Sequence, residues 1–164
     1  MNLKNSQRGF SLIELLIVVA IIGIIAAIAI PNLLASKRAA NEASAIASTR
    51  TLTGAEATYQ STKGQGEYGD LAALANEGLI DSVLGGGTHQ KGGYTFDVAT
   101  IAPDSTHTAR YDATAVPASA TGIGATGTRS FFSNEAGVIY FAAGGTAPTC
   151  DPDTRAVSAG APLK

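Results

Sequence analysis

Cysteine, tryptophan and charge are scarce in this chain. Cys150 is the only cysteine, tryptophan is absent, and charged residues make up 15% of the 164 residues. One cysteine excludes an intrachain disulfide and a zinc site built from several thiolates. A lone cysteine can act as a nucleophile beside a histidine, but neither His89 nor His107 has the sequence context of a catalytic triad. We therefore expect Cys150 to have no catalytic role.

The charge, the length and the glycine content of the chain limit the classes of function that it can have. The formal net charge is -2, and no basic stripe is interleaved with aromatic residues, so no nucleic-acid binding is evident. Beyond the apolar N-terminal run about 130 residues remain, which suffices for one modest core and excludes a large multidomain enzyme. The abundance of Gly, with 19 residues, is more typical of exported surface proteins than of cytosolic enzymes.

Motifs for catalysis and cofactor binding are missing from the sequence. The segment "GIGATG", residues 122–127, matches a dinucleotide fingerprint, but the strand-like "RSFFS" follows it where a helix is needed. Asp151 and Asp153 lie in a Pro-containing tail, where two acids are more often solvated than bound to a cation. We expect no enzyme activity, no cofactor and no metal.

The N-terminal segment "QRGFSLIELLIVVAIIGIIAAIAIP" is an apolar run that carries one carboxylate, Glu14. It has the charged start, apolar stretch and small-x-small end of a secretory signal, although the stretch is long for one. It also fits a plain membrane anchor, since a helix from Phe10 to Ile30 would rise about 31 Å. Neither interpretation explains an acid that costs on the order of 3 kcal/mol to place in lipid.

A third interpretation explains the acid. The residues Arg8-Gly9-Phe10-Ser11-Leu12-Ile13-Glu14 resemble the type III signal of type IV pilins and pseudopilins position by position. The resemblance implies a leader, residues 1–9, that a prepilin peptidase cuts between Gly9 and Phe10, N-methylation of Phe10, and retention of the helix. A glycine before the cut lets an extended backbone enter a protease cleft without a side chain to clash.

The resemblance also gives Glu14 a partner. In the pilin family the matching acid is thought to neutralise the N-terminal amine of a neighbouring subunit, which implies that Phe10 and Glu14 act in assembly. Two charges that are costly alone in an apolar bundle are tolerable together, and the pair favours one register. The alternative is a carboxylate at the membrane surface that headgroups solvate. Gly23 and Pro31 weaken the helix between them, which predicts either partial unwinding or a simple kink at Pro31.

The helix is expected to continue beyond the membrane. We predict one helix from residue 10 to about 60, with a transmembrane and polymerisation part at 10–31 and an amphipathic part at 32–62. The residues predicted to share its packed side are Leu34, Ala39, Ala43, Ile46, Arg50 and Thr53. Those predicted to be exposed are Lys37, Arg38, Asn41 and Glu42.

The remaining residues, 63–164, are predicted to form a globular head. Asp70 is a plausible N-cap for a short helix that Gly78 closes. The segments "YTFDVATI" and "ARYDATAV" alternate as an antiparallel hairpin, and "RSFFS" with "GVIYFA" forms a second. The fold class is therefore α+β, with a long helix packed on a small antiparallel sheet of about four strands. The Gly-, Ala- and Pro-rich tail from Gly144 is expected to be irregular.

The function implied by the resemblance is that of a structural subunit of a type IV pilus. The expected partners are further copies in a helical filament, the prepilin peptidase, an inner-membrane assembly platform with its motor ATPase, and the membrane. The subunit is expected to be a single-pass inner-membrane protein with a periplasmic head and then part of an extracellular pilus or a periplasmic pseudopilus. A type II secretion pseudopilin shares these N-terminal features and is the alternative. A membrane-anchored binding domain or enzyme would need a polar pocket that the sequence does not show.

Overall fold

The computed structural model describes residues 9–163. It contains two helices, α1 (Leu12–Thr62) and α2 (Leu71–Asn76). The strands are β1 (Gln90–Lys91), β2 (Tyr94–Ile101), β3 (Arg110–Pro117), β4 (Arg129–Asn134), β5 (Tyr140–Ala143), β6 (Thr149–Cys150), β7 (Val157–Ser158) and β8 (Ala161–Pro162). The chain divides into two compact units, Met1–Ser36 and Lys37–Lys164, which are described separately. The predicted α+β fold is confirmed.

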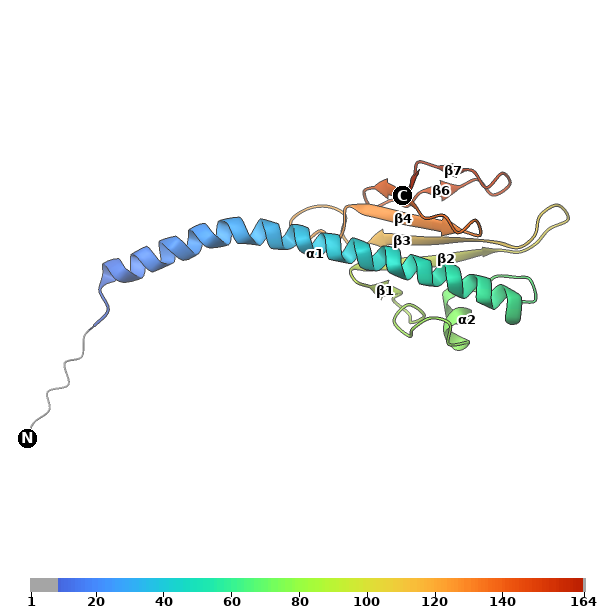
Figure 1. Cartoon of the computed structure of the whole chain (residues 1–164), viewed down its shortest axis with the longest axis horizontal. Coiled ribbons are helices and arrows are strands. Elements are labelled where there is room, and N and C mark those ends of the chain that lie inside the picture. Colours follow the sequence, from blue (N-terminus) through green and yellow to red (C-terminus); the bar gives the residue numbers. More distant parts are fainter. Residues whose placement is uncertain (1–8, 164) are drawn as a thin grey trace, which may run out of the picture. The chain divides into compact units, whose positions relative to one another are not determined.

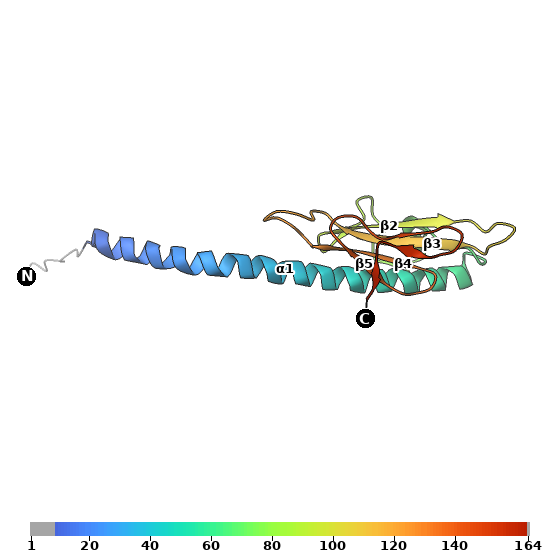
Figure 2. The same ribbon diagram turned by 90° about the horizontal axis from the view of Figure 1, so that it is seen from above.

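A six-stranded antiparallel sheet with the order β1-β2-β3-β4-β5-β8 forms the framework of the second unit. The two predicted hairpins are its four long strands, with Phe96 opposite Ala115 and Phe131 opposite Phe141. The two-residue strands β1 and β8 widen the sheet at its edges beyond the predicted four strands. The part of α1 that belongs to this unit lies along one face of the sheet (Figure 1), and the view from above separates helix and sheet into two layers (Figure 2).

The core fills the space between these two layers. Alternate residues of β2 and β3 point into it, including Tyr94, Phe96 and Tyr111, each at most 1% exposed. They pack with Leu52 of α1 and Leu74 of α2 in one cluster. The period-2 pattern of the sequence therefore identified the inward faces of both strands correctly.

The predicted packed side of α1 lies one residue away from the observed one, so that Leu34, Ile46 and Thr53 are only half-buried. The buried positions are Glu42, Ala45, Ser48, Thr49, Leu52, Ala55 and Glu56. Arg50, Ala39 and Ala43, which were expected to pack, are exposed. A shift of one residue turns a helix by about 100°. Of the residues that were expected to be exposed, Arg38 and Asn41 are half-buried and Glu42 is buried. Glu42 packs inward because Thr128 and Arg129 provide donors for its carboxylate.

The short helix and the tail are held by side-chain hydrogen bonds. Asp70 caps α2 as predicted, with Oδ1 accepting from the Ala73 N–H at 2.7 Å, and Gly78 follows with a φ of 69°. The tail is less irregular than expected, since β6 and β7 pair and β8 joins the main sheet. Arg155 fixes it by donating to Glu135 and Asp112 at 2.6 and 2.7 Å.

Candidate functional site

The first unit presents apolar side chains on every side of its helix. The Leu, Ile and Val residues of α1 between Leu12 and Ile30 are 48% to 80% exposed. In the described part of the chain α1 is the helix long and apolar enough to cross a membrane, and none of its apolar window is buried. A soluble protein rarely leaves so large an apolar surface open to water. This segment therefore needs lipid or other protein chains around it.

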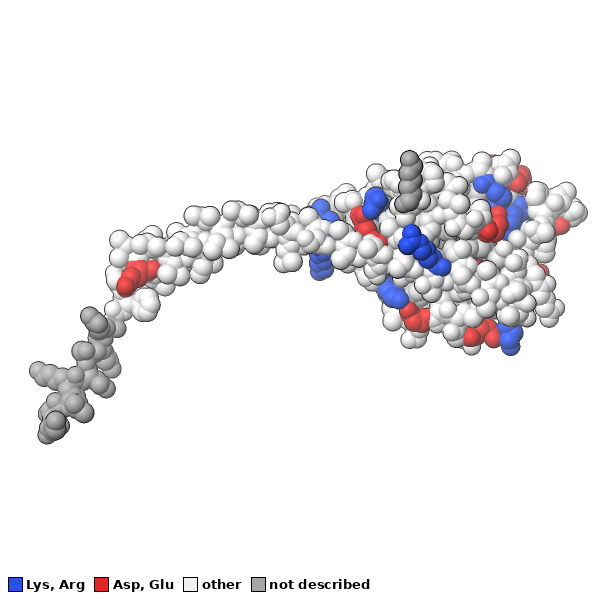
Figure 3. All heavy atoms as spheres, viewed as in Figure 1, with Lys and Arg blue, Asp and Glu red and all other residues white. Residues whose placement is uncertain are grey.

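Glu14 lies in the first turn of this helix. It is the only ionisable side chain between Gly9 and Ser36. The space-filling view shows a single red group on an otherwise uncharged stretch (Figure 3). Its Oε2 accepts a hydrogen bond from the Ser11 N–H at 2.9 Å. This is half of a capping box, in which a residue three positions into the helix satisfies a backbone donor that the helix leaves free.

The cap gives Glu14 a role that was not predicted from the sequence. The pattern Ser-x-x-Glu at Ser11 to Glu14 is a sequence signal for a helix start. An acid in the first turn also interacts favourably with the positive end of the helix dipole. Glu14 has a second oxygen for another donor, so capping and neutralisation of an amine are compatible.

Gly9 and Phe10 precede the helix and are exposed, with Phe10 85% exposed. A methyl group placed on Gly9 would meet nothing within 4 Å in the structure. Packing inside the chain therefore does not require a glycine here. A protease needs an accessible, non-helical peptide bond, and the bond between these two residues meets both conditions. Cleavage at this bond stays a prediction.

Gly23 and Pro31 do not interrupt α1, which is assigned as helix through both positions. Pro31 removes one backbone donor. The side-chain amide of the next residue, Asn32, donates to the Ile28 carbonyl at 3.1 Å. Loosening between Gly23 and Pro31 on assembly stays a prediction.

Two carboxylates of α1 are buried in the second unit. Glu42 accepts from the Thr128 N–H and Oγ1 at 2.8 and 2.7 Å, and from Nε and Nη2 of Arg129 at 2.9 and 2.8 Å. Burial alone would raise the pKa of Glu42, but these four donors lower it below its usual value. They tie α1 to the start of β4.

Glu56 is fully buried and poorly paired. Its Oε2 accepts from the Gly69 N–H at 3.1 Å, and Oε1 has no hydrogen-bond partner among the described residues. Burial raises the pKa of Glu56 to about 7, with a smaller contribution from the nearby charge of Asp70. Glu56 joins α1 to the loop before α2.

The other residues considered from the sequence make contacts within the second unit. Asp151 Oδ1 accepts from the N–H groups of Asp153 and Thr154, which forms a turn. Asn134 contacts the Cys150 sulfur at 3.6 Å. His89 Nδ1 lies 2.8 Å from the Leu84 carbonyl, and His107 lies beside Asp104 on the β2–β3 loop. Within residues 9–163 no three His, Cys, Asp or Glu side chains form a cluster suited to a metal.

Comparison with known proteins identifies the N-terminal segment. Residues 4–30 match the family model described as the prokaryotic N-terminal methylation motif. The N-terminal segment of this chain therefore carries that motif, and it is similar there to type IV pilins and to a type II secretion protein. Glu14 and the exposed apolar residues of α1 up to Ile30 lie within the matched residues.

The proteins that this chain resembles include both pilus and secretion proteins. It is 46% identical over 66 residues to the type IV major pilin protein PilA of Myxococcus xanthus, covering 40% of this chain and 29% of that protein. It is 40% identical over 88 residues to the fimbrial protein EcpC of Eikenella corrodens, covering 50% and 56%. It is 39% identical over 46 residues to the type II secretion system core protein G of Escherichia coli, covering 28% and 32%. The matches thus span about a third to a half of these relatives, and no solved structure matches the chain.

Proposed function

We propose that this chain is a structural subunit that polymerises through the first part of α1 into a type IV pilus. One observation carries the proposal: α1 has no buried residue in its membrane-length apolar window, and the one acid of this stretch, Glu14, caps the start of the helix. Lipid can cover this surface while the subunit is stored in the membrane. Other copies of the same helix can cover it in a filament, so one surface serves both states.

The first step of this function is proteolytic processing. In our proposal a prepilin peptidase removes residues 1–9, and the new N-terminus at Phe10 is methylated. The match of residues 4–30 to the methylation motif supports this order of events. The inner-membrane span is then 10–31, the helix continues over 32–62, and residues 63–164 complete a head on the periplasmic side. An assembly platform and a motor ATPase drive the transfer from membrane to filament.

The role of Glu14 in this proposal is to accept the charge of the Phe10 amine of a neighbouring copy. Cleavage creates that amine, and burying it in an apolar bundle without a partner would be costly. Because Oε2 already accepts the Ser11 N–H, the carboxylate is held at the end of the helix, where the amine of a neighbour arrives. Gly23 and Pro31 are proposed to let the helix adapt to crowding.

A pseudopilin of a type II secretion system is the second candidate, favoured by the match to core protein G. Deletion of the gene distinguishes the two. Loss of surface filaments seen by electron microscopy would support the pilus subunit, whereas loss of protein secretion without such filaments would support the pseudopilin.

Mass spectrometry of the native subunit tests the processing step. We expect an N-terminus at Phe10 that is heavier by one methyl group, and an accumulation of uncut precursor for Gly9→Val. A mature N-terminus near Ile30 would overturn the proposal in favour of a secretory signal.

A further inference from the structure

Most charged side chains of the second unit are paired within the chain. The ion pairs are Lys63–Glu77, Lys91–Asp81, Arg110–Asp104, Arg129–Glu42 and Arg155 with both Asp112 and Glu135. In the described residues three cations remain outside such pairs, Lys37, Arg38 and Arg50, and all three lie on α1. Lys37 and Arg38 begin the second unit.

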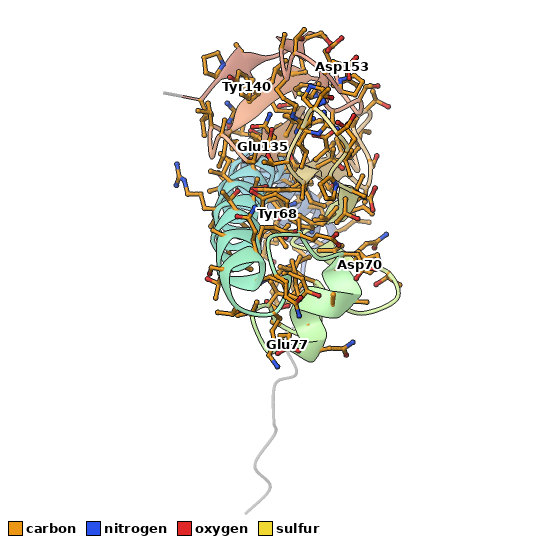
Figure 4. All side chains as sticks on the ribbon, turned by 90° about the vertical axis from the view of Figure 1, so that its right-hand side faces the viewer. Tyr68, Asp70, Glu77, Glu135, Tyr140 and Asp153 are labelled. Carbon is orange, nitrogen blue, oxygen red and sulfur yellow. The ribbon has the colours of Figure 1, made fainter. Side chains whose placement is uncertain are left out.

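Unpaired acids lie at the other end of this unit. Glu67 and Asp70 are in the loop after α1, and neither has an ion-pair partner among the described residues. Asp97 of β2 lines the same hollow as Asp70. The view onto this end of the molecule shows Asp70 near α2 and Asp153 on the tail above it (Figure 4).

The two sets of charges are too far apart to neutralise each other. From Lys37 to Thr62, where α1 ends, the helix rises about 38 Å. The loop that follows stays at that end, because Gln60 donates to the Gly66 carbonyl at 3.3 Å and Gly69 donates to Glu56 at 3.1 Å. A salt bridge needs an approach within about 4 Å, so any direct partner for these charges must come from a second molecule.

The exposed side of α1 between the two ends favours a close approach. Four of its exposed residues are Ala40, Ala43, Ala47 and Gly54, where soluble helices commonly carry long charged side chains. Small side chains lose little conformational entropy on contact. No long side chains at these four positions would therefore prevent a second copy from approaching the charged ends closely.

We propose that the basic end of one copy, Lys37 and Arg38, docks onto the acidic end of a second copy, formed by Glu67, Asp70 and Asp97. This contact rests on the proposed function and names the surface through which heads meet in the filament. It is heterologous, since two different surfaces meet, and each added copy leaves one basic and one acidic end open. Such a contact extends a filament rather than closing a dimer.

The contact sets the register of the heads more than their affinity. Exposed ion pairs each contribute little and are screened by salt, with a Debye length of about 10 Å at 0.1 M. Charge complementarity acts mainly by steering association and by penalising wrong juxtapositions. Filaments of this chain are therefore expected to form less efficiently at high ionic strength.

Charge reversal in the full chain tests the contact. The Lys37→Glu/Arg38→Glu chain and the Glu67→Lys/Asp97→Lys chain should each show a several-fold lower ratio of filamentous to membrane-held subunit. Asp70 is left unchanged because it caps α2. The control is Arg50→Glu/Lys91→Glu, which changes the net charge as much as the basic-end reversal does, at cations outside both proposed ends. Because the exposed Lys91–Asp81 pair contributes little to stability, this chain should assemble nearly as well as the natural chain.

Two combinations make the test specific. A chain with all four reversals has complementary ends again and should recover filaments. Cells that produce the two half-reversed chains together should also recover filaments, with the two chains in equal amounts. Failure of both rescues, or normal filaments from either half-reversed chain, would overturn the contact. If the natural chain forms no polymer at all, the proposed function fails and the contact with it.

Discussion

Both halves of α1 carry large apolar side chains, but these side chains differ in what covers them. Ile22 in the first half is 59% exposed, whereas Leu52 in the second half is fully buried against the sheet. The difference is not one of helix propensity, because a single helix runs through both. The second half finds its partners within the chain, and the first half has to find them outside. One helix therefore both folds the head and leaves a surface for lipid and other copies.

The acids of α1 show the same contrast. Glu42 has four donors around its carboxylate, Glu56 has one, and Glu14 has the Ser11 N–H. Glu42 and Glu56 differ in the direction of their pKa shifts because hydrogen bonds outweigh desolvation only at Glu42. Each hydrogen-bond donor thus offsets part of the cost of placing a carboxylate in apolar surroundings. The carboxylate of Glu14 can accept a hydrogen bond from one more donor.

The first comparison concerns how much each half contributes to the stability of the head, and it uses Leu52→Ala and Leu33→Ala. Leu52 is 0% exposed and Leu33 is 69% exposed. Removing the buried side chain should lower the free energy of unfolding of the head by about 2–5 kcal/mol. The exposed change should alter it by less than about 0.5 kcal/mol. Denaturant unfolding of the detergent-solubilised chain measures both, and equal losses would show that the halves do not differ in packing.

Ile21→Lys and Ala47→Lys compare the halves through membrane insertion. A lysine near the middle of the apolar window should cost on the order of 3 kcal/mol on insertion, which is roughly a 100-fold shift of the insertion equilibrium. A lysine at Ala47 lies on an exposed position of the second half and should leave insertion unchanged. Fractionation of membranes from cells measures the inserted fraction. Full insertion of the Ile21 variant would show that this segment does not lie in lipid.

The pH dependence of stability separates Glu56 from Glu42. Glu56 releases its proton near pH 4.5 when unfolded and near pH 7 when folded, so its contribution to stability declines as the pH rises between these values, by roughly 2–3 kcal/mol. Glu56→Gln should therefore be the more stable chain at pH 8, and its advantage should vanish near pH 4. For Glu42 the folded pKa is lowered, so the stability that it contributes is present above pH 4.5 and is lost in acid.

Measuring unfolding of both Gln variants against the natural chain from about pH 2 to pH 8 gives these differences directly. The Glu56 variant is expected to lose its advantage as the pH falls toward 4, whereas the Glu42 variant is expected to lose its disadvantage only below about pH 4.5. The same trend for both would show that their surroundings in the folded head are alike.

Local patterns in the sequence predicted the parts of the fold that depend on local contacts. The alternation through Tyr94, Phe96 and Val98 identified β2 and its inward face, and Asp70 was identified as a cap from the residues that follow it. The packed face of α1 was misplaced because Glu42 finds its donors at Thr128 and Arg129, more than 80 residues away. No local pattern shows that a charged residue has such partners.

At the N-terminal site, too, some features were predicted from the sequence and others were not. The residues from Arg8 to Glu14 predicted the N-terminal methylation motif, which the family model confirms, but the cap between Ser11 and Glu14 was missed although its sequence signal is local. Glu14 combines a charge that is costly in lipid with an oxygen that accepts a hydrogen bond, and only the charge was considered in the prediction. The regular structure of the tail was not predicted, because Arg155 pairs with Glu135 and Asp112, which lie on other strands and turns.

Substitution of Glu14 tests the central claim, that the exposed half of α1 assembles through a charged pair. Glu14→Gln keeps an oxygen that can cap the Ser11 N–H but removes the charge, whereas Glu14→Ala removes both. The quantity to measure is the ratio of filamentous to membrane-held subunit, in cells where cleavage after Gly9 is shown to be normal. We predict that both variants insert and that both lose filaments several-fold, because the Phe10 amine lacks its partner in each. Normal filaments from Glu14→Gln, with a defect only in Glu14→Ala, would contradict the claim and leave Glu14 as a helix cap alone.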